Sequence, residues 1–195
     1  MSDVREIMLV RHPETVANQE RRLCGTTASP LTPRGERQAA SLASAIVAWG
    51  PDVVYTSPSD RTRAVAALVD PRGERTIVLD DVREIDFGRA EGLTYDELPV
   101  RGITLDFTGA GPVAPGGEDG SAFDSRVGRA TEALLGGPPR AVVITHGGVL
   151  RLLLSHLLGL PADATWRIDL PNAAIAIVRV TDGYALLAEL RRPPE

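Results

Sequence analysis

Two short apolar segments of this chain each end abruptly in a histidine, and no other feature constrains the fold as much. Residues Ile7 to Val10 run into Arg11 and His12, and residues Ala141 to Thr145 run into His146. Short apolar runs that stop at a charged side chain are typical of buried strands that deliver polar groups to the edge of a sheet. The chain has only three histidines, so two of them at predicted strand ends indicate a functional site at that edge.

Predicted strands alternate with predicted helices along the rest of the chain. Thr32 and Pro33 are typical of a helix start, and apolar residues then recur at helical spacing as far as Gly50. The other expected elements are strands at 52–56, 76–79 and 141–145, helices at 61–69, 121–135 and 148–158, and a closing hairpin at 174–180 and 184–190. This order predicts an α/β fold, a three-layer α/β/α sandwich with a mainly parallel sheet and an antiparallel edge hairpin.

One domain is expected, because 195 residues fit a single hydrophobic core. Between about residues 89 and 120 the periodicity is lost, glycine and proline recur, and only a short helix near 95–98 is expected. We interpret this stretch, called the lid segment below, as a lid or substrate loop over the site rather than as a second domain.

The basic residues number 21, all of them arginine, against 26 acidic residues, for a net charge of −5. No basic stripe is present, which argues against a nucleic-acid partner. The absence of lysine excludes P-loop, Schiff-base and Ser-Lys chemistry. Cys24 is the only cysteine, so no internal disulfide forms. The first residues lack a signal sequence and no apolar run approaches about 18 residues, so we expect no membrane association and a cytoplasmic protein.

The residues at the predicted sheet edge suit phosphoryl transfer. A neutral imidazole at His12 could attack phosphorus, and the guanidinium groups of Arg11 and Arg61 match phosphate oxygens. His146, if protonated, would be a further donor, and Glu84 could protonate the leaving oxygen. Taken singly, Arg11 and His12 could equally form a structural pair, and Glu84 could be a solvated acid.

Six blocks in the same order resemble the histidine phosphatase superfamily, in its phosphoglycerate-mutase-like branch. The blocks are Arg11-His12-Pro13-Glu14-Thr15 with Asn18; Gly25 with Ser29-Pro30-Leu31-Thr32-Pro33-Arg34-Gly35; Ser57-Pro58-Ser59-Asp60-Arg61; Glu84-Ile85-Asp86-Phe87-Gly88 with Glu91-Gly92; Pro115-Gly116-Gly117-Glu118; and Thr145-His146-Gly147-Gly148. The resemblance covers most of the chain and implies a phosphatase that forms a phosphohistidine and hydrolyses a small phosphomonoester, with no metal and no cofactor.

The resemblance also implies the site residues. The implied catalytic residues are His12, Glu84, His146, Arg11 and Arg61. The implied substrate contacts are Arg11, Asn18, Arg61, His146, Gly147, Arg22, Cys24 and Gly25, with Tyr95 and Arg101 as further candidates. The chain departs from the family pattern at Pro13, where glycine is usual, and at Ala28, where aspartate is common. Pro13 lacks an N–H that could otherwise face a phosphate, so we expect slower catalysis.

Several alternatives stay open at this point. The same chemistry would serve a phosphoglycerate mutase, although Phe87 replaces a tyrosine of the mutases, lysine is absent and the segment from Leu93 to Gly120 has one arginine, Arg101. An inactive phosphate-binding protein is an alternative of another class, and a metal hydrolase is weaker because no ligand spacing is present. Sugar phosphates, phosphoglycerate derivatives and nucleoside-type monophosphates such as ribazole phosphate are candidate substrates. A homodimer is left open.

Overall fold

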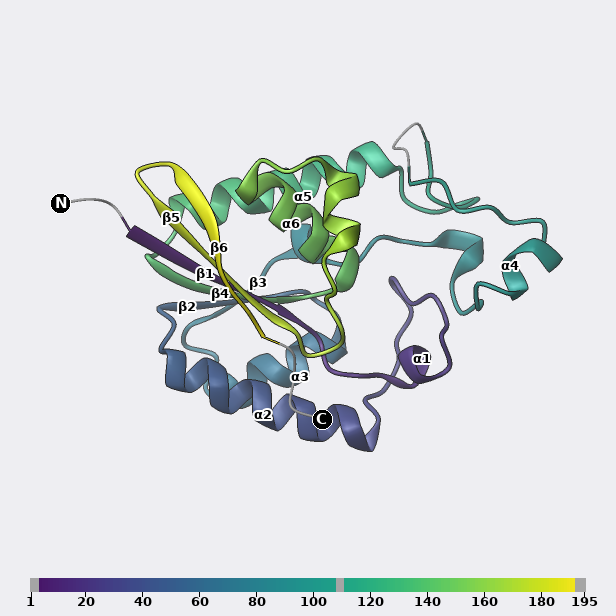
Figure 1. The fold of residues 1–195 in the computed structure, drawn as a ribbon. Coiled ribbons are helices and arrows are strands. Elements are labelled where there is room, and N and C mark those ends of the chain that lie inside the picture. Colours follow the sequence, from purple (N-terminus) through teal and green to yellow (C-terminus); the bar gives the residue numbers. More distant parts are fainter. Residues whose placement is uncertain (1–3, 108–110, 192–195) are drawn as a thin grey trace.

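A six-stranded sheet runs through the centre of the computed structural model, which describes residues 4–107 and 111–191 (Figure 1). The strands are β1 (Val4–Arg11), β2 (Val53–Thr56), β3 (Thr76–Val78), β4 (Arg140–Thr145), β5 (Ile175–Thr181) and β6 (Tyr184–Arg191). Their order is β3-β2-β4-β1-β5-β6, in which the first four are parallel and β5 and β6 are antiparallel. The predicted fold class, with a mainly parallel sheet and an antiparallel edge hairpin, is therefore confirmed.

Helices cover both faces of the sheet (Figure 1). Helices α2 (Pro33–Trp49) and α3 (Asp60–Val69) lie on one face, and α5 (Gly120–Gly136) and α6 (Gly147–Leu158) lie on the other. The predicted caps of α2 are present: the Thr32 hydroxyl accepts the Gly35 N–H at 3.0 Å, Pro33 occupies the first turn, and Gly50 ends the helix at a left-handed φ of 74°.

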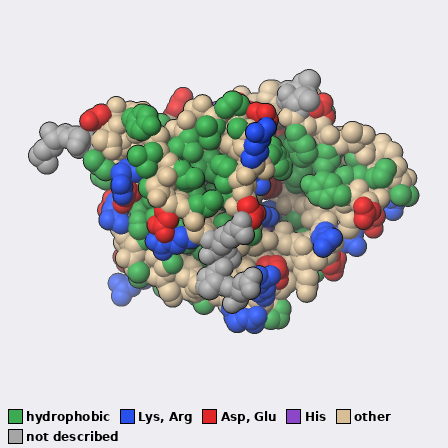
Figure 2. All heavy atoms as spheres, viewed as in Figure 1, with side chains coloured by type: hydrophobic (Ala, Val, Ile, Leu, Met, Phe, Trp, Pro, Cys, Tyr) green, Lys and Arg blue, Asp and Glu red, His purple; other side chains and the backbone are tan. Residues whose placement is uncertain are grey.

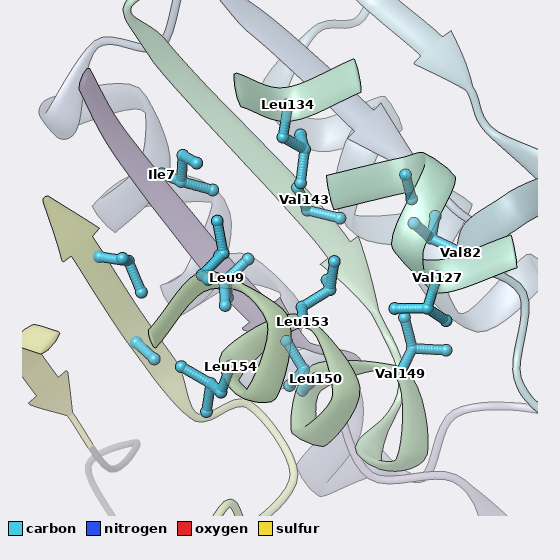
Figure 3. Close-up of a cluster of buried hydrophobic side chains, with 14 of the residues drawn as sticks. Ile7, Leu9, Val82, Val127, Leu134, Val143, Val149, Leu150, Leu153 and Leu154 are labelled. Atoms are coloured by element: carbon cyan, nitrogen blue, oxygen red, sulfur yellow. The ribbon is translucent and has the colours of Figure 1, made fainter. Parts of the chain in front are cut away.

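The apolar run of β1 is unbroken because both of its faces are buried. Ile7 and Leu9 point toward α6, where they join Leu150 and Leu153 in one core cluster (Figure 3), and Met8 and Val10 belong to the cluster under α2 and α3. A strand buried on both faces needs apolar side chains at every position. The same burial leaves its carboxyl end, at Arg11 and His12, as the place where polar side chains emerge.

The remaining elements are short. They are helices α1 (Val16–Gln19) and α4 (Glu97–Val100), and the 3-10 turns η1 (Asp80–Val82), η2 (Gly88–Ala90) and η3 (Ala162–Arg167). The helix expected near 95–98 is thus α4, whereas no element was expected at η3. The lid segment is irregular as predicted, packs on a small apolar cluster that includes Leu98 and Ile103, and in part, at 108–110, lies outside the described residues. Within 4–107 and 111–191, no helix combines the length and the apolarity of a membrane span.

Candidate active site

The carboxyl ends of β1 and β4 open into a cavity of about 790 Å³. Figure 2 shows the molecule hollowed between the body that carries the sheet and the lobe that carries α4. Arg11, His12, Glu84 and Gly147 line the cavity. Asn18, Arg22, Cys24 and Tyr95 also line it, so eight of the sequence candidates meet here although they come from four separate parts of the chain.

His12 is held in one tautomer. Its Nδ1 lies 2.7 Å from the carbonyl oxygen of Pro13. Because a carbonyl only accepts hydrogen bonds, Nδ1 must carry the proton, and Nε2 keeps its lone pair. Burial, then the charges of Arg61 and Arg11, lower the pKa of His12 well below its ordinary value. His12 is therefore a neutral imidazole with a free nucleophilic nitrogen at neutral pH.

Pro13 does not disturb this arrangement. The contact to His12 uses the carbonyl oxygen of residue 13, and proline retains that group. The backbone N–H of His12 donates to the carbonyl of Thr145 at 2.8 Å, which ties the end of β1 to the end of β4. The departure from the family pattern removes a donor and leaves the group that orients the imidazole in place.

Asn172 is a second support for His12, and no sequence motif pointed to it. Its Nδ2 donates to the carbonyl of His12 at 3.2 Å and to Oδ1 of Asn18 at 3.0 Å. The same Oδ1 accepts the N–H and the hydroxyl of Thr15. Since these contacts all use Oδ1, the Asn18 amide is oriented with its donor end available to a phosphate oxygen.

One N–H group of Arg11 lacks a hydrogen-bond acceptor among the described residues. Its Nη1 donates to the carbonyl of Leu170 at 2.6 Å, whereas its Nε is buried and has no hydrogen-bond partner within the described part of the chain. Burial lowers the pKa of Arg11 and the nearby Glu84 raises it, and a guanidinium stays charged in proteins. A buried N–H without an acceptor is costly, so Arg11 is suited to receive an anionic oxygen.

Arg61 and His146 lie deeper in the protein than their sequence motifs suggested. His146 is fully buried, its Nε2 lies 2.8 Å from the Ser57 hydroxyl, and its Nδ1 accepts the Arg61 Nε–H at 3.2 Å. Neither Arg61 nor His146 lines the cavity. His146 was expected to be protonated and to donate to the phosphate. This geometry disfavours that role, because a proton on Nδ1 of His146 would face the Arg61 Nε–H.

The other Arg61 nitrogens hold the loop at 24–27. They donate to the carbonyls of Cys24, Gly25 and Thr27 at 2.8–3.3 Å. All three guanidinium nitrogens of Arg61 thus already donate to protein atoms, so Arg61 does not offer a phosphate two parallel free N–H groups. It acts on the site through its charge, which lowers the pKa values of His12 and His146.

Gly25 contributes through close packing. A Cβ at Gly25 would lie 1.9 Å from the carbonyl oxygen of Ile85, and Gly25 does not line the cavity. Its N–H donates to the Glu91 carboxylate at 3.0 Å, as does that of Thr26 at 3.1 Å. Gly25 was expected to contact the substrate. Instead, its backbone N–H binds the Glu91 carboxylate and holds the loop in place.

Glu84 lies beside the N-terminus of α6. Its Oε2 accepts the N–H of Gly148 at 3.0 Å and its Oε1 accepts its neighbour's N–H, that of Ile85, at 3.1 Å. A Cβ at Gly148 would lie 2.6 Å from Oε1, so this close approach requires glycine. Glu84 is 9% exposed and lines the same cavity as His12.

The two buried histidines make stability depend on pH. Burial is the main cause that lowers the pKa values of both His12 and His146, whereas in the unfolded chain each takes a proton below about pH 6.5. Below that pH the unfolded state binds more protons than the folded state. The free energy of unfolding is therefore retained above about pH 6.5. It decreases as the pH is lowered further, by up to about 1.4 kcal/mol per pH unit for each histidine.

Urea unfolding between pH 7.5 and 5.5 measures this slope. We expect His146→Asn to reduce the slope by about half, whatever its effect on the absolute stability. The matched control is His156→Gln, since His156 is exposed and pairs with Asp124 at 3.1 Å. A wild-type free energy that stays constant over this pH range would contradict the prediction.

The donor set does not suggest a metal centre. Within residues 4–107 and 111–191, no three His, Cys, Asp or Glu side chains converge to hold a metal ion. Positive charge lines the cavity at Arg11, Arg21, Arg22 and Arg151, and the charge of Arg61 also acts on Arg11.

Comparisons with known proteins agree with this geometry. Residues 7–192 match the model of the histidine phosphatase superfamily, branch 1. The protein named "Probable phosphoglycerate mutase GpmB" of Cronobacter sakazakii is 36% identical over 181 residues, which are 89% of this chain and 84% of that protein. The α-ribazole phosphatase of Shigella flexneri superposes with a TM-score of 0.85 at 26% identity, over 96% of each chain. YhfR of Bacillus stearothermophilus superposes with a TM-score of 0.80 at 28% identity, over 94% of this chain and 95% of that one.

Proposed function

Because this chain belongs to the histidine phosphatase superfamily, we propose that it hydrolyses a small phosphomonoester through a phosphohistidine at His12, without a metal. One observation carries the proposal: the Nδ1–H of His12 donates to the Pro13 carbonyl, which leaves Nε2 as a neutral nucleophile at a cavity. The unpartnered Nε–H of Arg11 supplies the matching donor for the phosphate.

The first half of the reaction transfers the phosphoryl group to the protein. The Nε–H of Arg11, the amide of Asn18 and the N-terminus of α6 at Gly147 hold the phosphate oxygens. His12 Nε2 attacks phosphorus, the bond from phosphorus to the ester oxygen breaks, and protonated Glu84 gives its proton to that oxygen.

The second half returns the protein to its starting state. The Glu84 carboxylate takes a proton from a water molecule, whose oxygen attacks the phosphorus of the phosphohistidine. The N–P bond breaks, inorganic phosphate leaves and His12 is again a neutral imidazole. The buried charge of Arg61 opposes protonation of His12 at each stage.

A phosphoglycerate mutase is the second candidate, because the relative from Cronobacter sakazakii carries that name. A mutase must grip the substrate carboxylate with free cations and keep water out of the site. Arg21 and Arg22 from the loop region both line the cavity, and Arg22 is already paired with Glu20 at 2.8 Å and Glu97 at 3.1 Å. This pairing favours hydrolysis over retention of a three-carbon acid.

The test is incubation with 3-phosphoglycerate and 2,3-bisphosphoglycerate in the presence of EDTA. We expect release of inorganic phosphate from a panel of phosphomonoesters and at most a trace of 2-phosphoglycerate. Strong inhibition by vanadate should accompany this, since vanadate mimics a pentacoordinate phosphorus. Interconversion faster than phosphate release would establish a mutase, and loss of turnover with EDTA that Mg²⁺ restores would refute metal independence.

A further inference from the structure

The cavity is much larger than a phosphate needs, and its outer part is aromatic. A volume of about 790 Å³ is that of a pocket for a drug-sized molecule. Away from Arg11 and His12 it is lined by apolar side chains from three regions: the lid segment, α5 with α6, and η3. They include Phe107, Phe123, Leu152 and Trp166.

Phe107 and Trp166 bring distant parts of the chain together across this outer part. Their ring centroids are 5.7 Å apart and their planes are tilted by 58°. Even so, Trp166 is 56% exposed and Phe107 is 49% exposed. Large aromatic side chains that line a cavity and keep half of their surface in water are typical of a ligand-binding groove.

Trp166 is held in position from beneath. The Arg151 guanidinium lies 4.6 Å from the centre of the Trp166 ring, and its Nη1 donates to the carbonyls of Thr165 and Ile168 at 2.5 and 3.0 Å. Arg151 thus anchors η3 to α6 and stacks on the indole. A pre-positioned aromatic ring loses little entropy when a second flat group packs against it.

Arg21, Arg22 and Arg151 line the cavity, and the last two already have partners within the protein. Arg22 is neutralised by Glu20 and Glu97, and Arg151 is engaged by carbonyls and by Trp166. Asp124 adds a negative charge to the lining. A leaving group with a carboxylate or a second phosphate would have to displace these contacts to bind Arg22 or Arg151.

We infer that Trp166 and Phe107 form a subsite for a flat apolar or aromatic leaving group, so that the substrate class is a phosphomonoester of a ring-bearing alcohol. The inference rests on the proposed phosphatase activity. The phosphate would lie at Arg11 and His12, and the ring would cover the exposed surface of Trp166. Specificity would then come from η3 and the lid segment rather than from the phosphate site.

Two alkyl substrates test this directly, 2-phenylethyl phosphate and ethyl phosphate. Their alkoxides leave with similar difficulty, so their difference measures recognition of the ring. We expect kcat/KM to be about tenfold or more higher for 2-phenylethyl phosphate. Trp166→Ala should remove most of that preference, with the value for ethyl phosphate kept within about threefold, and Trp166→Phe should restore much of it.

The chain provides a matched control in its other tryptophan. Trp49 also stacks with an arginine, Arg140, at 4.5 Å, but it lies at the end of α2 and does not line the cavity. Trp49→Ala should keep the preference for the ring. Circular dichroism of each variant separates loss of folding from loss of recognition.

The outcomes separate the subsite from the activity. Three results would overturn the subsite and leave the phosphatase activity standing. The first is equal turnover of both substrates, and the second is a preference that survives in Trp166→Ala and Phe107→Ala. The third is a higher kcat/KM for 3-phosphoglycerate than for 2-phenylethyl phosphate. Turnover of none of the three substrates would refute the proposed function and the subsite together.

Discussion

Replacing His12 with alanine should lower turnover of every phosphomonoester by about 10³-fold or more, because no other histidine of the described residues lines the cavity. The expectation follows from the bond between Nδ1 of His12 and the Pro13 carbonyl, which orients Nε2 and keeps it unprotonated. The pKa of His12, held down by burial, keeps the imidazole neutral well into mildly acidic solution.

Rapid acid-free quenching after mixing with ³²P-labelled substrate checks the intermediate. The wild-type protein should carry an acid-labile, alkali-stable label, and His12→Ala should carry none. His156→Ala is the matched control, since His156 is exposed and lies outside the cavity lining, and it should retain both label and turnover. A fully active His12→Ala protein would end the proposal, and a labelled protein that releases no phosphate would point to a binding protein.

Replacing Glu84 with glutamine should separate substrates by their leaving groups. Alkyl phosphates should lose about 10²–10⁴-fold in kcat/KM, because an alkoxide leaves poorly without a proton, and 4-nitrophenyl phosphate should lose only about 10–100-fold. Glutamine is nearly isosteric with glutamate, and its carbonyl oxygen can still accept the Gly148 N–H, although its NH2 group cannot accept the Ile85 N–H as Oε1 of Glu84 does. The change removes the transferable proton and one local acceptor and keeps the volume of the side chain.

The matched control for this substitution is Glu132→Gln on the exposed side of α5, which should leave both activities unchanged. The ratio of the two losses is the decisive quantity, since a general decline in folded protein would lower both rates equally. Equal losses on the alkyl and the nitrophenyl substrates would assign Glu84 a structural role at the start of α6 instead.

The elements that could be predicted are those with local signals. The cap at Thr32 and Pro33, and the glycine stop at Gly50, lie within or next to the helix they define, and the structure places α2 at Pro33–Trp49. The apolar runs that end at Arg11 and Thr145 likewise become β1 and β4, with only small shifts in their bounds. Short-range patterns of this kind survive folding because neighbouring residues alone generate them.

The side-chain partners in the site could not be predicted in the same way. Arg61 meets the carbonyls at 24–27, and Asn172 meets the carbonyl of His12. These contacts join residues that are far apart in the chain, so no sequence window contains both partners. Arg61 and His146 were expected on the phosphate because their residue types suit it, whereas packing buries both and keeps them out of the cavity lining.

The sequence by itself determined the sheet edge and the chemistry that gathers there, because a buried strand must end before a charged residue and because few residue types can attack phosphorus. Only the tertiary structure decided the tautomer of His12, the lack of an acceptor for the Nε–H of Arg11 among the described residues and the shape of the cavity. The outer wall depends on Phe107 and Trp166, which come from a segment without periodicity and from a turn that no pattern indicated. Their meeting is a consequence of how α6 and the lid segment pack, and packing is a property of the whole fold.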